Sequence, residues 1–358
     1  ASRLTIAGIG NEKIQWERTR RINIGVDANL LNNRLGVRFN YFRSATDHLL
    51  MWQEMSYLSG LDKTWGNGGK LENRGFDVEA TGVVWASPSW QWQVGASVGH
   101  YKNKVTALPD GQRYMDTEIL GATVRTEIGR PANLFYGYKA QGVFSTSAEA
   151  QAAGLYIHDD NGVDRTAFEA GDMHFADLDG DHFITEADRM VIGDPNPDIY
   201  GNIFTSVQYR RLRLDVRFNY SLGNDIYNYT RQQLESGSRF MNQTTALARR
   251  WQMEGQQTDI PRLSFQDPMG NSRFSDRWIE DGSYLRLKTV TLSYDLPVSS
   301  TFLQGLQFWV QANNVVTLTR YLGSDPEGTA LSAVLGQGID AGSLPQSRNF
   351  MVGIKINL

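Results

Sequence analysis

A chain of 358 residues exceeds one typical domain, although barrels and sandwiches often reach this length as single units. Its 35 basic and 39 acidic residues give a formal net charge of -4, and no run of Lys or Arg alternates with aromatic residues, so we expect no nucleic-acid partner. The absence of cysteine rules out a disulfide framework and cysteine-ligated metal sites, and it suits a chain that crosses an oxidising periplasm before it folds.

The hydropathy of the sequence excludes a helical membrane protein. No stretch approaches the roughly 18 consecutive apolar residues that a membrane-spanning helix needs, and the mean hydropathy is -0.41. A β-barrel stays possible, because half of each strand faces water or protein and the lipid-facing half shows only as alternation. Residues 1–4 lack the basic region and apolar core of a signal peptide, so we expect either a mature chain or a segment of a longer one.

Alternation of apolar and polar residues with a period of two predicts about nine β-strands. In chain order they are residues 22–30, 35–41, 76–84, 90–98, 203–209, 212–220, 290–296, 306–312 and 350–358. In residues 212–220 the two faces separate completely, which lets us assign a lipid-facing and a lumen-facing side. The apolar, lipid-facing side holds Leu214, Val216 and Phe218, and the charged, lumen-facing side holds Arg213, Asp215 and Arg217.

The connections between these strands alternate between short turns and long polar loops. Short turns are predicted at residues 32–33, 87–89, 210–211 and 297–305, and long loops at 44–70, 103–200, 223–283 and 315–348. Short turns on one side and long loops on the other are typical of outer-membrane barrels, whereas the connections of a β-sandwich do not sort in this way. Within the third long loop, residues 225–251 carry helix formers with apolar residues at helical intervals, which predicts a loop helix.

The predicted fold class is all-β, an antiparallel transmembrane β-barrel with long extracellular loops. An odd number of strands that ends at the chain terminus cannot close on itself, because closed single-chain bacterial barrels have even strand numbers. We therefore expect residues 1–358 to be the C-terminal portion of a larger barrel, with the plug and the earlier strands absent from this chain. The strand at 350–358 should then pair with a strand of another segment.

Motifs distributed over nearly the whole chain carry a family resemblance. They are residues 14–17 (IQWE), 71–75 (LENRG), 137–138 with 142–144, 171–172 leading to 177–181, 191–197 (VIGDPNP), 223–228 (GNDIYN), 278–288 (WIEDGSYLRLK) and 313–314 running to 325–327. Their order and spacing together resemble the SusC/RagA family of TonB-dependent transporters from Bacteroidetes. One departure is Leu358, which stands where outer-membrane barrels usually end in an aromatic residue.

The resemblance implies a plugged outer-membrane barrel of about 22 strands, of which this chain supplies about nine. It also implies a SusD-like surface lipoprotein that closes over the barrel as a lid, and energy delivered by the TonB complex. The implied function is nutrient uptake at the cell surface, namely TonB-dependent import of oligosaccharides or oligopeptides, without enzymatic activity.

Residues 177–188 have the spacing of a calcium-binding loop. The ligands would be Asp177, Asp179, Asp181, the Phe183 carbonyl, Thr185 and Asp188, at positions 1, 3, 5, 7, 9 and 12 of the loop. Two features depart from the usual pattern: His182 replaces the glycine that eases a sharp turn, and Asp188 has a shorter arm than the usual glutamate. A bound Ca²⁺ would have a structural role, pinning a long extracellular loop. The alternative is a solvated acidic loop that binds no ion.

Two other interpretations are less well supported by the sequence. Residues 95–99 match the pattern of a nucleophile elbow, but Ser97 lies inside an alternating strand and not at a strand-to-helix turn, so we predict no catalytic site. A surface β-rich adhesion or binding module stiffened by calcium is the rival function. Charged lumenal residues opposite an unbroken apolar face argue against that module.

Overall fold

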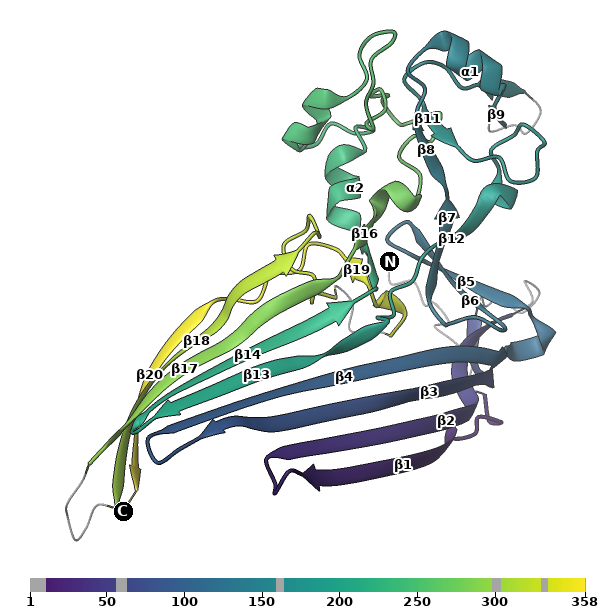
Figure 1. Ribbon diagram of the computed structural model, residues 1–358. Helices are drawn as coiled ribbons and strands as arrows, with labels where there is room; N and C mark the ends of the chain where they lie inside the picture. The colour runs from purple at the N-terminus through teal and green to yellow at the C-terminus, as the bar shows by residue number, and fades with distance from the viewer. Residues whose placement is uncertain (1–10, 56–62, 159–163, 298–303, 330–333, 358) are drawn as a thin grey trace, which may run out of the picture.

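The computed structural model describes residues 11–55, 63–158, 164–297, 304–329 and 334–357. Nine long strands form one curved sheet in which each strand is antiparallel to the next (Figure 1). In their order across the sheet they are β1 (Arg18–Leu30), β2 (Leu35–Glu54), β3 (Lys63–Ala86), β4 (Trp90–Ala107), β13 (Ile199–Tyr209), β14 (Leu212–Leu222), β17 (Tyr284–Leu296), β18 (Gly305–Thr319) and β20 (Asn349–Asn357). The predicted strand number and the antiparallel barrel-type fold are confirmed. Within the described residues β1 and β20 are the two edges of this sheet and do not pair with each other.

The prediction of a loop at residues 44–70 was wrong, because most of these residues belong to β2 and β3. The ladder between β2 and β3 continues through Thr46 opposite Leu71 to Glu54 opposite Lys63, with register shifts around Leu49. Apolar alternation marks a strand only where its two faces have different surroundings. The extensions keep their backbone hydrogen bonds but lack that pattern, and polar contacts such as Asn67 with Gln15 and Leu50 with Glu17 join them to the N-terminal segment.

The two faces of the sheet differ in chemistry. Residues that lie opposite each other on neighbouring strands share a face: Leu214 lies opposite Leu292, and Asp215 lies opposite Thr291. The polar face lines a hollow of about 520 Å³ and is the lumenal one. The predicted orientation is therefore confirmed. Leu214, Val216 and Phe218 lie on the outward face, and Arg213, Asp215 and Arg217 lie on the lumenal face.

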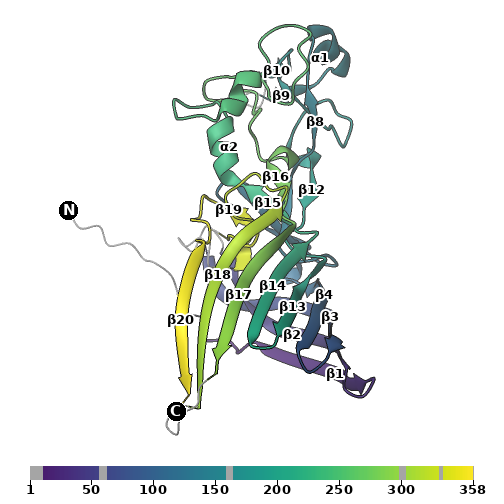
Figure 2. The ribbon, with the colours of Figure 1, turned by 60° about the vertical axis from the view of Figure 1, so that its left-hand side comes forward.

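Three long connections carry folded structure of their own and stand together over one end of the sheet (Figures 1 and 2). The first, residues 108–198, contains η2 (Pro109–Gly111), β5 (Tyr114–Ile119), β6 (Ala122–Glu127), β7 (Leu134–Tyr138), β8 (Ala140–Val143), α1 (Ser147–Ala153), β9 (Tyr156–His158), β10 (Arg165–Ala167), β11 (Met173–Phe175), η3 (Glu186–Asp188) and β12 (Arg189–Gly193). Strands β12, β7, β6 and β5 form a small sheet in that order. Helix α1 begins at the side-chain cap of Thr146 and ends at Gly154, whose φ of 61° suits glycine.

The second and third connections are shorter. Residues 223–283 contain β15 (Asp225–Asn228), α2 (Tyr229–Glu235), η4 (Thr245–Arg249), η5 (Asp276–Trp278) and β16 (Ile279–Asp281), and residues 320–348 contain η6 (Val334–Gly336) and β19 (Ile339–Asp340). The predicted helix over 225–251 was too long, since α2 ends just before Gly237, which takes a left-handed φ of 64°. No helix in the described part of the chain is long and apolar enough to cross a membrane.

The hydrophobic core lies in these loops and not in the sheet. One cluster joins residues of all three loops: Ala122, Val124 and Phe135 from the first, Tyr227, Phe274 and Trp278 from the second, and Ile339 from the third. A second cluster, which includes Phe144, Phe175 and Ile184, packs the outer part of the first loop. The loops therefore form one packed cap.

The assignment of the two faces predicts opposite effects for neighbouring substitutions. Ile203→Arg places a charge on the outward face, which at mid-depth in a bilayer costs about 2–4 kcal/mol, so the folded, heat-modifiable fraction in membranes should fall. Asn202→Arg is the matched control, because Asn202 faces the lumenal hollow. Comparable loss of folded protein for both variants would contradict the assignment.

Candidate functional site

The lumenal face of the sheet is lined with hydrogen-bonding side chains. Arg38 reaches Asp27 on one side and Glu79 on the other, each at 3.1 Å, so two carboxylates share one cation on this part of the sheet. Between β17, β18 and β20 a chain of hydrogen-bonded side chains follows the wall: Thr291, Gln311, Asn313 and Asn349. A surface of this kind suits polar solutes that exchange hydrogen bonds as they pass.

Aromatic rings lie flat against this wall where glycines make room for them. A Cβ atom on Gly99 would lie 2.7 Å from the Tyr200 ring, and one on Gly95 would lie 2.3 Å from the Phe204 ring. A larger residue at either position would force the ring to move, so glycine lets each ring lie close to the backbone of β4. The rings add flat apolar area to an otherwise polar lumenal surface.

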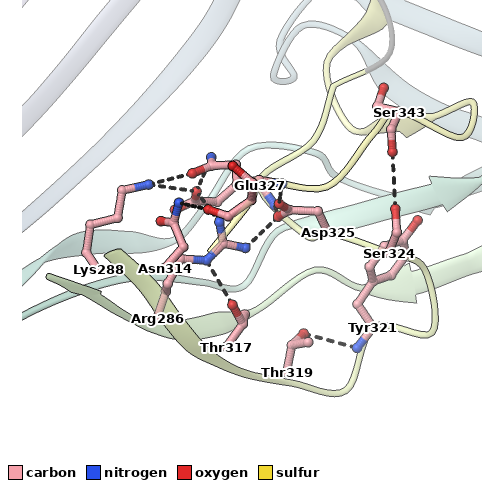
Figure 3. A network of polar contacts seen from close by, with 12 residues as sticks. Arg286, Lys288, Asn314, Thr317, Thr319, Tyr321, Ser324, Asp325, Glu327 and Ser343 are labelled. Carbon is pink, nitrogen blue, oxygen red and sulfur yellow. Dashed lines mark hydrogen bonds and ion pairs between the residues drawn. The ribbon is translucent and has the colours of Figure 1, made fainter. Parts of the chain in front are cut away.

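A buried ion-pair network ties the third loop to the wall (Figure 3). Arg286 of β17 is 3% exposed and bonds Asp325 at 2.6 Å and Glu327 at 2.7 Å. Lys288 adds a 3.4 Å contact to Glu327 from a more exposed position. The Asp325 carboxylate also accepts the backbone amides of Gln346 and Glu327, so the loop is held at two separate points of its backbone.

The Asp325 carboxylate of this network keeps its negative charge to a lower pH than an isolated aspartate. Burial alone would raise the pKa of Asp325, but the hydrogen bonds from Arg286 and from the amides of Gln346 and Glu327 outweigh it and lower the pKa. A carboxyl with a lowered pKa stabilises the fold at neutral pH and loses that effect only as the pH falls through its lowered value.

The network was missed by the sequence interpretation. Asp325 and Glu327 were recognised only as part of a family motif, without a role. The available signal was a pair of cations, Arg286 and Lys288, at a spacing of two on one strand, matched by two carboxylates at the same spacing after the next strand. The two pairs come together only because the third loop folds back against β17, and the sequence does not show this path.

The second and third loops are also joined by backbone and side-chain bonds. Strand β15 pairs with β16 on one side and, in parallel, with β19 on the other, where Tyr227 lies opposite Ile339. The Tyr321 hydroxyl donates to the Asp340 carboxylate at 2.5 Å, and both side chains are buried. The third loop is therefore joined to the second loop through β19 and to the sheet through Asp325 and Glu327.

The acidic loop at 177–188 is the candidate metal centre. Oxygen atoms of Asp177, Asp179 and Asp188 lie within 4.8 Å of one another, and Asp188 is fully buried. The predicted ligand Asp181 lies outside this group, and one of its oxygens accepts the Phe183 amide at 2.7 Å. Thr185 caps η3 with its side chain and donates its amide to Asp188. The structure thus brings three of the predicted carboxylates together.

The backbone of this loop follows the turn that a calcium loop requires. His182, at the position where glycine is usual, is exposed and has a left-handed φ of 68°. Phe183 forms a bridge with Tyr156, and Ile184 is buried in the core of the first loop. The loop is therefore anchored to the cap on its apolar side and leaves its carboxylates on the other.

The carboxylates of this group differ in acidity. Burial would raise the pKa of Asp177, but the amides of His182 and Gly180 outweigh it, so the pKa is lowered. The pKa of Asp179 is raised: the Asp181 amide acts to lower it, but desolvation and the negative charges around it prevail. A cation among these oxygens would offset that repulsion.

Comparison with known proteins shows which proteins have sequences similar to this sheet and its loops. Over 366 residues the chain is 30% identical to TonB-dependent receptor P3 of Formosa agariphila, a match that covers 99% of this chain and 35% of the relative. Over 369 residues it is 25% identical to TonB-dependent receptor SusC of Bacteroides thetaiotaomicron, covering 97% of this chain and 32% of SusC. The chain is a homologue of the TonB-dependent receptors.

The fold comparison agrees with the sequence comparison. The structure of the RagAB peptide transporter matches with a TM-score of 0.78 at 24% identity, over 98% of this chain and 36% of that one. The resemblance to the SusC/RagA family seen in the sequence motifs is confirmed, and a homologue of these receptors is not an enzyme. This chain spans about a third of the length of the relatives it matches. No model of a known protein family matches it.

The ion-pair network predicts a strong effect for Arg286 and a weak one for Lys288. Arg286→Ala leaves two carboxylates without their donor, and breaking a buried pair costs about 3–5 kcal/mol, so hydrogen exchange at the amides of Glu327 and Gln346 should accelerate. Lys288→Ala removes an exposed contact worth less than about 1 kcal/mol and is the control. Equal acceleration in both variants would show that the network does not hold the loop.

Proposed function

We propose that this chain forms part of the wall of a TonB-dependent importer in a bacterial outer membrane. The observation that carries the proposal is the two-faced sheet of nine strands with a folded cap over one end. Homology to TonB-dependent receptors over nearly the whole chain supports it. The rival function, a calcium-stiffened adhesion module, would leave the outward apolar face in water, where exposed side chains such as Ile24, Val26 and Val352 would be unfavourable.

The proposed cargo is an oligosaccharide or an oligopeptide. Both classes are soluble through many hydrogen-bonding groups, which match the amides and hydroxyls along the lumenal face. The flat rings of Tyr200 and Phe204 could stack on a sugar ring or pack against a peptide side chain. The RagAB peptide transporter among the similar structures supports the oligopeptide class.

We propose three kinds of partner for the complete receptor. The open edges of β1 and β20 require further strands, so this chain would be the C-terminal part of a barrel whose plug and earlier strands lie outside it. A SusD-like lipoprotein would cover the packed cap as a lid. The TonB complex would act on the missing N-terminal part and supply the energy.

We further propose that the acidic loop binds a structural Ca²⁺. Carboxylate oxygens of Asp177, Asp179 and Asp188 would be direct ligands, as hard oxygen donors suit this ion. Asp181, the Phe183 carbonyl and Thr185 would complete the shell after small rearrangements. The role is structural, because the loop is anchored at Ile184 and the ion would fix its free, repelling side.

Uptake measurements test the transport proposal. Cells that carry the complete receptor should import labelled oligosaccharides or oligopeptides above the size limit for free diffusion, and cells without it should not. Collapsing the proton-motive force should stop this uptake, because a TonB-dependent step draws on it. Uptake that persists without the force, or without the receptor, would contradict the proposal.

Calcium titration tests the metal proposal. Ca²⁺ should protect the loop at 177–188 from protease, and Asp177→Asn or Asp188→Asn should abolish the protection. Glu186→Gln is the matched control, because Glu186 lies beside the cluster but pairs with Arg189. Because the pKa of Asp179 is raised, protons compete for the site at a higher pH than for an isolated aspartate, and affinity should weaken as the pH falls. Protection that is equal in chelator and in Ca²⁺ would favour the solvated loop.

A further inference from the structure

The outward face carries an unusual row of cations near the long-loop end of the sheet. Arg43 on β2 lies directly opposite Arg74 on β3, and Arg74 lies directly opposite Lys102 on β4. All three side chains are exposed. Like charges placed directly opposite each other destabilise a sheet, so this row costs free energy unless an anion meets it.

Among the described residues, only one of these three cations has an ion pair. Arg43 pairs with Glu72 at 3.1 Å. Arg74 and Lys102 have no ion pair and no side-chain hydrogen bond within the part of the chain that the structure describes. Further cations follow on the same face toward the strand ends, namely Arg20 opposite Ala45 and Lys104 opposite Glu72.

A groove of about 620 Å³ borders the row. The four cations Arg43, Arg74, Lys102 and Lys104 line it from the outward face, together with Tyr41, and Tyr101 and Asn103 line it from the opposite face of β4. The first loop contributes Gly129, Pro131, Asp194, Asn196, Pro197 and Asp198. It also holds the carboxylates of Glu72, Asp194 and Asp198, of which Glu72 pairs with Arg43 and Asp194 accepts the amide and the side chain of Asn196. The groove therefore offers two cations without an ion pair, Arg74 and Lys102, beside carboxylates and other polar groups, and its volume could hold a sugar ring.

The position of the row along the strands matches the edge of a membrane. Directly below it, Tyr41, Phe76 and His100 lie opposite one another, and below these the face is apolar. Toward the short turns, Trp85 lies opposite Trp92. From Trp92 to Lys102, about ten residues at roughly 3.3 Å each and a strand tilt of about 40° give about 25 Å, the height of the apolar band of such barrels. The row thus lies at the headgroup level beneath the long loops.

We propose that this row binds the headgroup of a phosphorylated glycolipid in the outer leaflet. Its phosphates would meet Arg43, Arg74 and Lys102, since guanidinium groups bind phosphate in a bidentate manner and an ammonium adds a point charge. Its sugars would occupy the adjoining groove. The proposal rests on the proposed outer-membrane location, but not on what the receptor imports.

Lipid retention by the complete, purified receptor tests the proposal. After detergent exchange, mass spectrometry should find phosphorylated glycolipid on the wild-type receptor and at least about tenfold less on the Arg74→Gln/Lys102→Gln variant, if the two lost contacts together are worth about 1.4 kcal/mol or more. The Arg213→Gln/Arg217→Gln variant is the matched control, because it removes the same charge from the lumenal face and should retain the lipid. Equal retention by all three receptors overturns the proposal.

A stability measurement separates binding from folding. In glycolipid-free detergent the Arg74→Gln/Lys102→Gln variant should unfold at the same or a higher temperature than the wild type, because the repulsion between the cations of the row is relieved. In bilayers that contain the glycolipid the order should reverse. If bilayers of phosphatidylglycerol stabilise the wild type equally well, the row recognises phosphate without the sugar, and the glycolipid assignment is wrong. Solute uptake by the Arg74→Gln/Lys102→Gln variant tests the transport function separately, since transport can fail or persist whether or not the row binds glycolipid.

Discussion

Hydrocarbon offers no hydrogen-bond partner to a backbone amide, so strands that cross a membrane must satisfy every amide and carbonyl against neighbouring strands. The nine-stranded sheet obeys this constraint at each internal strand, through the continuous ladders from β1 to β20. Because the ladder uses all backbone groups, the side chains alone decide which face meets lipid and which meets the lumen. The separation of Leu214 from Asp215 is one instance of that division.

The loops are stabilised differently. Water can form hydrogen bonds with their backbone groups, so the burial of apolar side chains has to hold them in one conformation. Their core gathers Phe135, Tyr227, Trp278 and Ile339 from three connections that lie far apart in the sequence. The Arg286 network then attaches the third connection to the wall. A cap that is packed internally and fixed to the sheet presents a defined surface, which a set of separate mobile loops would not.

Prediction from the sequence succeeded where the environment imposes a pattern. Residues 212–222 alternate because the two faces of the sheet have different surroundings, whereas the extensions of β2 and β3 contact the N-terminal segment through polar groups and show no such pattern. The acidic spacing located Asp177, Asp179 and Asp188, but Asp181 lies outside the group that these three form. Contacts such as Arg286 with Asp325 depend on the path of a loop, which periodicity does not encode.

The central claim is that this sheet is a membrane wall with one face in lipid and the other in an aqueous lumen. The chain contains no cysteine, so single cysteines along β14 can carry nitroxide spin labels in the membrane-inserted receptor. Collision with oxygen, which dissolves in lipid, should peak at positions 214, 216 and 218, and collision with a water-soluble nickel chelate should peak at 213, 215 and 217. Oxygen and nickel profiles that rise and fall together along the strand would contradict the claim.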